Sequence, residues 1–296
     1  MNKKAIFFRT GYLLSALSAA WLFGGCGEPV KPPIVPEVSS VFMESSQGEF
    51  EEEWKETAPS DVPEESEDSF SVETSPEELS MAEEGKRGDY LVVIDAGHQK
   101  KGNSEKEPIG PGATEEKAKV ASGTQGCSTK IPEYELTLAV SKEVEQILLN
   151  RGYQVKMVRD TNDVDISNAE RAQVANEAGA DAFVRIHANG AADSTVNGAE
   201  TLCQTAQNPY NAVFYEDSRR LSEAVLEGLV EATGCKKRFV NETDTMSGIN
   251  WCQVPVTIVE VGFMSNPEED ERMATEEYRG KIAEGIANGI DAYFGL

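Results

Sequence analysis

From Asp89 to the C-terminus, short apolar runs alternate with longer amphipathic stretches. This alternation is typical of strands interleaved with helices and predicts an α/β fold. The run from Tyr90 to Asp95 (YLVVID) is almost continuously apolar, as expected of a strand covered on both faces. We therefore expect residues 89–296 to form a single α/β domain, with a mostly parallel central sheet flanked by helices.

The remaining elements follow the same alternation. Apolar runs predict further strands over residues 153–158, 182–186, 198–203 and 254–261. Amphipathic periodicity predicts helices that begin at Glu133 after Pro132, at a capping box from Ser167 to Glu170, and over residues 213–232 and 277–294. In an open α/β sheet the working crevice lies outside the carboxyl ends of the strands, so residues at these ends are the candidates for a site.

Both histidines of the chain are predicted to lie at such strand ends. His98 follows the first strand and His187 ends the strand over residues 182–186. Glu260 interrupts the apolar strand over residues 254–261, where an ionised side chain needs a metal, a partner or solvent. A lone histidine is more often a hydrogen-bonded core or surface residue than a ligand, and Glu260 alone could be a paired buried carboxylate. Together they indicate one site.

Two neutral imidazoles and one carboxylate are typical of hydrolytic zinc sites, which keep a fourth position open for water. Glu133 can supply the carboxylate, although Glu135 lies two residues further on and periodicity does not separate the two. A strand-end carboxylate beside the activated water can accept its proton and return it to the leaving amine. We predict this role for Glu260.

The same residues carry a resemblance to a known family. The motifs, in order, are residues 95–98 (DAGH), Glu133, Arg159-Asp160, Arg171 with Ala175-Asn176, residues 185–189 (RIHAN), residues 259–263 (VEVGF) and residues 265–267 (SNP). Over residues 91–294 the chain resembles the zinc-dependent N-acetylmuramoyl-L-alanine amidases of the amidase-3 type. The resemblance implies one Zn2+ ion on His98, Glu133 and His187, with Glu133 rather than Glu135 as ligand and Glu260 as the catalytic glutamate. It implies hydrolysis of the amide between the muramic lactyl group and L-alanine in peptidoglycan.

Two departures and two weaker candidates accompany the resemblance. Ala96 stands where the family has proline, and 34 residues separate His98 from Glu133. This segment is rich in Gly and Pro and is expected to rim the cleft, where it shapes substrate choice or acts as a lid; the alternative is a tolerated surface insertion. Asn189 is a candidate for a supporting or substrate-binding residue. Residues 244–251 are expected to line the cleft, with Trp251 alternatively a core residue.

The N-terminus predicts export. Residues 1–25 combine a charged start, a short apolar stretch and small residues before Cys26, as in a lipoprotein signal peptide. The alternative is that this segment is an uncleaved transmembrane anchor. Cys26 follows Phe23-Gly24-Gly25 and resembles a lipidation site, with Phe23 where leucine is usual. We expect a protein lipid-anchored through Cys26 to the outer face of the cytoplasmic membrane, facing the cell wall.

Residues 26–88 are predicted to be an acidic, disordered linker. Between Gly27 and Gly85 there are 18 acidic residues and two lysines, and the whole chain carries a formal charge of -25. Such a segment acts as a self-repelling spacer or simply as a solubilising tail. The acidity argues against nucleic acid as a partner, because phosphates are bound by Lys and Arg. We expect a monomer whose partners are peptidoglycan and the membrane.

Some alternatives stay open at this point. Cys127, Cys203, Cys235 and Cys252 allow three full disulfide pairings or free thiols. A peptidase or deacetylase acting on the same polymer could use similar ligands. A non-catalytic wall-binding lipoprotein could keep the fold, although a binder would have no need of Glu260.

Overall fold

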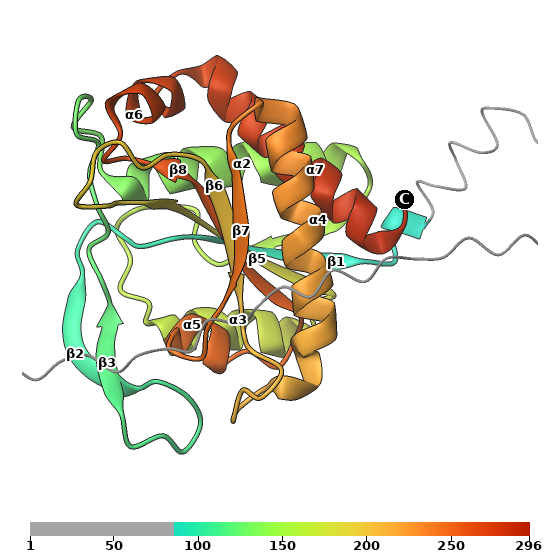
Figure 1. The fold of residues 1–296 in the computed structure, drawn as a ribbon. Helices are drawn as coiled ribbons and strands as arrows, with labels where there is room; N and C mark the ends of the chain where they lie inside the picture. Colours follow the sequence, from blue (N-terminus) through green and yellow to red (C-terminus); the bar gives the residue numbers. More distant parts are fainter. Residues whose placement is uncertain (1–85) are drawn as a thin grey trace, which may run out of the picture. The chain divides into compact units, whose positions relative to one another are not determined.

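A six-stranded sheet runs through the computed structural model, which describes residues 86–296 (Figure 1). The strands lie in the order β4-β1-β5-β8-β6-β7. Their bounds are β1 Leu91–Ala96, β4 Gln154–Met157, β5 Ala182–Asn189, β6 Ala199–Cys203, β7 Lys237–Glu242 and β8 Val256–Phe263. The predicted signal peptide, Cys26 and residues 26–85 of the predicted linker lie outside the described residues.

The sheet is mostly parallel, as predicted. β1 pairs in parallel with β4 and β5, and β5 pairs in parallel with β8. β6 is antiparallel to β8 and parallel to β7. The central strands β1, β5 and β8 are buried almost throughout, which explains their nearly continuous apolar runs. The carboxyl ends of these three strands therefore meet at one edge of the sheet.

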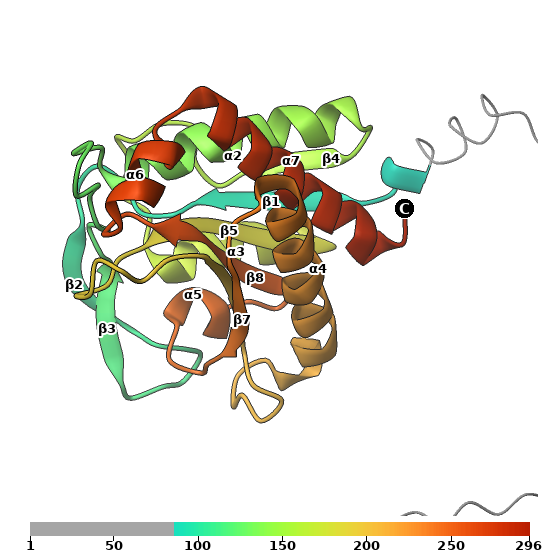
Figure 2. The ribbon, with the colours of Figure 1, turned by 45° about the horizontal axis from the view of Figure 1, so that its top comes forward.

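Helices cover both faces of the sheet (Figure 2). Their bounds are α2 Glu133–Asn150, α3 Asn168–Ala178, α4 Tyr215–Thr233, α5 Ser247–Asn250, α6 Pro267–Met273 and α7 Glu276–Phe294, with a short 3-10 helix, η1, at Ala212–Phe214. The strand alternation of β1 sends Val92 and Ile94 into a core shared with α2, α4 and α7, and Val93 into a second core shared with α3 and α5. The fold is thus a three-layer α/β domain.

The segment between His98 and Glu133 folds into a hairpin that sequence periodicity does not predict. β2 Asn103–Pro108 and β3 Glu116–Val120 pair antiparallel in a separate two-stranded sheet. The sequence of β2 (NSEKEP) is polar throughout, because the hairpin buries little more than Glu107, Ile109 and Val120. Trp251 Nε1 donates a hydrogen bond of 2.8 Å to the carbonyl of Pro108 and ties the hairpin to α5.

Four elements that are short or mix polar with apolar residues are likewise not predicted from the sequence: β7, α5, α6 and η1. β7 (KRFVNE) is the last strand of the sheet and is partly exposed along its length. Each described helix is too short or too polar to cross a membrane. Within residues 86–296 the four cysteines are free thiols, with Cys127 exposed and the other three buried.

Candidate metal centre

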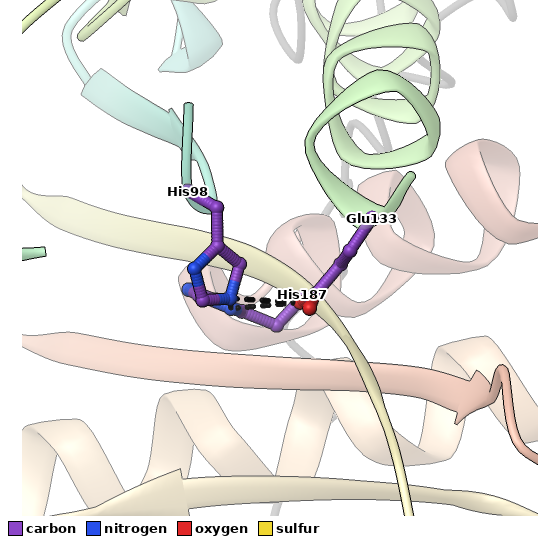
Figure 3. Close-up of side chains that lie close together, drawn as sticks. All are labelled: His98, Glu133 and His187. Carbon is purple, nitrogen blue, oxygen red and sulfur yellow. Dashed lines mark hydrogen bonds and ion pairs between the residues drawn. The ribbon is translucent and has the colours of Figure 1, made fainter. Parts of the chain in front are cut away.

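Three side chains from three separate elements converge at the carboxyl edge of the sheet (Figure 3). His98 Nε2 lies 3.1 Å from Glu133 Oε1 and 3.1 Å from His187 Nδ1. His187 Nδ1 lies 3.2 Å from the same carboxylate oxygen. The three candidate ligand atoms therefore form a nearly equilateral triangle.

His98 sits on a strained turn after β1. Its φ of 60° is in the left-handed region, which is unusual for a residue with a side chain. Buried guanidinium groups hold this turn by its carbonyls: Arg159 donates to Ala96 and Gly97, and Arg171 donates to Ala96 and His98. The turn is thereby fixed so that the imidazole faces the other two side chains.

The carbonyl of Ala121 fixes the ring of His98 from the opposite side. His98 Nδ1 lies 2.9 Å from the Ala121 oxygen, so Nδ1 donates this hydrogen bond and Nε2 is the ring nitrogen that faces the cluster. Ala121 belongs to the segment that returns from the β2–β3 hairpin. The insertion thus contributes directly to the orientation of a candidate ligand, a role that no side-chain pattern in the sequence could reveal.

A buried ion-pair network lies directly beneath the turn. Asp95 accepts hydrogen bonds from Arg171 Nη1 at 2.6 Å and from Arg185 Nε at 2.9 Å. Burial alone would raise the pKa of Asp95, but the two guanidinium groups outweigh it and lower the pKa to about 2. The last residue before the turn is therefore an anion locked between two cations.

Glu133 is the first residue of α2 and is almost fully buried, whereas Glu135 points to solvent. Its Oε2 accepts a hydrogen bond of 2.8 Å from the Thr124 amide, and Oε1 accepts one of 3.1 Å from the Ala188 amide. Burial favours the neutral acid, but the contacts with His187 and His98 outweigh it and hold the pKa of Glu133 well below its usual range. The structure therefore brings Glu133, and not Glu135, into the cluster as an anion.

His187 lies inside β5, two residues before its end. Burial lowers the pKa of its imidazole to about 4, so the ring is neutral at neutral pH and its nitrogen lone pair is free for a ligand. Gly97 makes room for this ring, because any side chain at position 97 would overlap it. The glycine of the turn is thus required by the approach of the second histidine.

Glu260 lies on β8 directly opposite His187 on β5, so both side chains project from the same face. Its Oε2 is buried and has no hydrogen-bond partner among the described residues. Burial raises the pKa of Glu260 well above its ordinary value, and the negative charges of Glu133 and Glu200 add to this effect. A buried carboxylate oxygen without a partner is the atom of this site that is available to exchange a proton.

Two cavities meet at the cluster, and His98, His187 and Glu260 line both. One, of about 250 Å³, extends toward α5 and is lined also by Arg185 and Asn168; we call it the Arg185 cavity. The other, of about 430 Å³, extends past Glu133 toward residues 188–191. A substrate that passes across the cluster can thus place one part in each cavity.

The weaker candidates are found beside the cluster. Asn189 lines the larger cavity and donates a hydrogen bond of 3.0 Å to Glu200, which also binds Arg238. The side chain of Asn189 therefore hydrogen-bonds Glu200 and none of the three candidate ligands. In the segment 244–251, residues 246–248 line the Arg185 cavity, whereas Trp251 packs in the second core and buttresses the hairpin.

The donor set fits a zinc ion. Tetrahedral zinc with bonds of about 2.0–2.2 Å needs donor atoms about 3.3–3.6 Å apart, close to the 3.1–3.2 Å observed. One anionic carboxylate and two imidazoles, each oriented by a further hydrogen bond or by close packing, are the chemistry that zinc sites use. The three side chains are thus a candidate metal centre with access from two cavities.

Comparison with known proteins identifies the family of the chain. Residues 92–292 match the family model described as N-acetylmuramoyl-L-alanine amidase (Amidase_3). The uncharacterized protein YqiI of Bacillus subtilis is 32% identical over 203 residues, covering 69% of this chain and 84% of that protein. The amidase AmiA of Salmonella typhimurium is 27% identical over 240 residues, covering 69% and 76%. The crystal structure of the amidase Ami1 from Mycobacterium smegmatis superposes with a TM-score of 0.63 at 27% identity, covering 70% of this chain and 97% of that one. This chain belongs to the N-acetylmuramoyl-L-alanine amidase family.

Proposed function

We propose that the protein is a zinc-dependent amidase that hydrolyses the bond between the muramic lactyl group and L-alanine in peptidoglycan. His98 Nε2, Glu133 Oε1 and His187 Nδ1 would hold the ion. When bound, zinc supplies a Lewis acid for the scissile carbonyl and lowers the pKa of a water molecule. The observation that carries the proposal is the triangle of three ligand atoms with Glu260 on the neighbouring strand.

Glu260 is proposed as the proton carrier of the reaction. Its carboxylate accepts a proton from the attacking water while the C–O bond forms, and it delivers that proton to the L-alanine nitrogen as the C–N bond breaks. The products are a lactyl carboxylate and a free L-alanine amine. Because burial and neighbouring negative charges raise the pKa of Glu260, the group is a stronger base than an exposed glutamate.

The cellular setting is proposed from the sequence of residues 1–88. Export, lipidation of Cys26 and an extended acidic linker would place the catalytic domain on the outer face of the cytoplasmic membrane, within reach of the cell wall. The proposal includes a monomer, since the site is built from one chain. Membership of a family described as acting on a wall component supports this location.

Product analysis with two variants tests the chemistry. Purified peptidoglycan digested by the wild-type protein should gain L-alanine amino termini, whereas a peptidase would expose other amino termini and a deacetylase would free amino sugars. Glu260→Gln should keep the zinc and lose about 100- to 10,000-fold in rate. His98→Ala should lose the zinc itself. Glu135→Gln, at the exposed glutamate of the same helix turn, is the matched control and should behave like the wild type.

The proposal fails if the wild-type protein releases no L-alanine termini while it holds one zinc ion per chain. The assigned role of Glu260 fails separately if Glu260→Gln turns over at a rate close to that of the wild type.

A further inference from the structure

The Arg185 cavity contains a cation that the hydrolytic chemistry does not use. Arg185 lies on β5, two residues before His187, and its side chain is only 3% exposed. It lines the same cavity as His98, His187 and Glu260. A positive charge is thus held at a fixed place beside the bond that the enzyme would cut.

Arg185 is anchored through two of its three nitrogens. Nε donates to Asp95 at 2.9 Å, and Nη2 donates to Asn168 Oδ1 at 2.9 Å. Nη1 packs against Gly248 at the cavity wall, where any side chain at position 248 would overlap it. Within the described residues Nη1 has no hydrogen-bond acceptor, so its N–H groups remain available for a ligand.

Asn168 is oriented in the same way. Its Oδ1 accepts from Arg185, and this contact fixes the amide so that Nδ2 is a second donor without an acceptor among the described residues. Asn168 also lines the Arg185 cavity. Two neighbouring N–H donors, one of them cationic, are the arrangement that binds a carboxylate.

The partner of Arg185 does not neutralise it fully. Asp95 is shared between Arg171 and Arg185, so one carboxylate faces two guanidinium groups in a buried region. Val120, Met246 and Ile258 make part of the remaining wall apolar, and its polar residues are His98, His187, Ser247 and Glu260. An anionic group would therefore be recognised at one end of the cavity, and aliphatic groups along its sides.

We propose, on the basis of the amidase function above, that Arg185 and Asn168 bind a free carboxylate of the stem peptide. The lactyl carboxyl group is consumed in the scissile amide, and the sugar hydroxyls are neutral, so the carboxylate must come from the peptide. The residue after L-alanine in the stem is a glutamate linked through its γ-carboxyl group, and its α-carboxylate is free unless the cell amidates it. The Arg185 cavity then receives the peptide, and the larger cavity receives the sugar.

A matched pair of substrates tests this assignment on the unmodified enzyme. The zinc-loaded full chain is given muramyl-L-alanyl-isoglutamate and its α-amide, muramyl-L-alanyl-isoglutamine, each with the γ-carboxyl group blocked as a methylamide, so that the α-carboxylate is the one free carboxylate and the only difference between them. We expect kcat/KM to be about 10- to 100-fold higher for the free acid, the range for a hydrogen bond to a charged group. Equal rates on the two substrates would overturn the carboxylate assignment and leave the amidase function standing. Cleavage of neither would count against the amidase function itself.

Three variants test which residues distinguish the free acid from its α-amide. Arg185→Gln should bring the ratio of the two kcat/KM values close to one. Because Arg185 also neutralises Asp95, a second variant leaves that pair in place: Asn168→Asp puts a negative charge beside the carboxylate and should depress cleavage of the acid more than that of the amide. Arg220→Gln, at an exposed arginine paired with Asp217, is the control and should keep the wild-type ratio. An equal loss on both substrates in Asn168→Asp would assign that residue a structural role only and overturn the proposal.

Discussion

Removal of the charge of the buried Asp95 carboxylate should lower the stability of the fold substantially. Asp95→Asn keeps the shape of the side chain but leaves the guanidinium groups of Arg171 and Arg185, both nearly inaccessible to solvent, without their counter-ion. Breaking a buried pair in this way costs about 3–5 kcal/mol. For a domain of this size each kcal/mol lowers Tm by about 2–4 °C. We therefore expect Asp95→Asn to melt about 6–20 °C below the wild type at neutral pH.

The pH dependence of the unfolding free energy provides a second test of the same prediction. Since the pKa of Asp95 falls from 3.8 to about 2 on folding, its ionisation contributes about 2 kcal/mol of stability at neutral pH. A lowered folded pKa means that this contribution is complete above about pH 4–5 and is lost as the pH falls toward 2. The gap in Tm between the wild type and Asp95→Asn should therefore narrow over that range.

Thermal melts of the full chain in the presence of a chelator measure this effect without a contribution from bound metal. Glu105→Gln is the matched control, because Glu105 forms a 2.8 Å ion pair with Lys119 at an exposed position. Exposed pairs contribute about 0–1 kcal/mol, so its Tm should stay within about 4 °C of the wild type. If Asp95→Asn melts no lower than Glu105→Gln at pH 7, or if its deficit persists unchanged at pH 2–3, the reasoning is refuted.

Two further predictions concern glycines, each with a glycine control. Gly123→Ala would place a Cβ 2.8 Å from Glu133 Oε2 at a φ of 79°, and should weaken zinc binding about 10- to 100-fold in a chelator competition. Gly112→Ala has the same backbone strain, with a φ of 76° but open space, and should leave zinc affinity unchanged; equal affinities in the two variants would contradict the clash. In α7, Gly289→Ala would overlap the backbone of α4 and should lower stability by about 1–3 kcal/mol in urea unfolding. Gly280→Ala meets only ordinary contacts and should gain about 0.5–1 kcal/mol, so a stability gain in both variants would refute the close packing.

Local patterns account for the elements that the sequence predicts well. The strand at residues 90–95 and the capping box at Ser167 correspond to β1 and to the observed cap of α3. Boundaries are less well predicted: β8 begins at Val256 rather than residue 254, and β5 continues through His187 to Asn189. A strand ends where its pairing with the neighbouring strands ends, and the periodicity of the sequence carries no information about this pairing.

The parts that could not be predicted depend on long-range or backbone contacts. The β2–β3 hairpin has no apolar alternation, because its stability comes from a few contacts such as that of Trp251 with Pro108. The Ala121 carbonyl that orients His98 has no side-chain signature at all. Asp95 gives no sign in the sequence that it will pair with Arg171 and Arg185, which lie 76 and 90 residues away.

The most direct test of the zinc centre is anomalous X-ray scattering at the zinc edge from crystals of the purified protein. The account predicts one strong peak at about 2.0–2.2 Å from His98 Nε2, Glu133 Oε1 and His187 Nδ1, absent after chelation. A zinc-loaded, active protein whose peak lies away from these three atoms would contradict it.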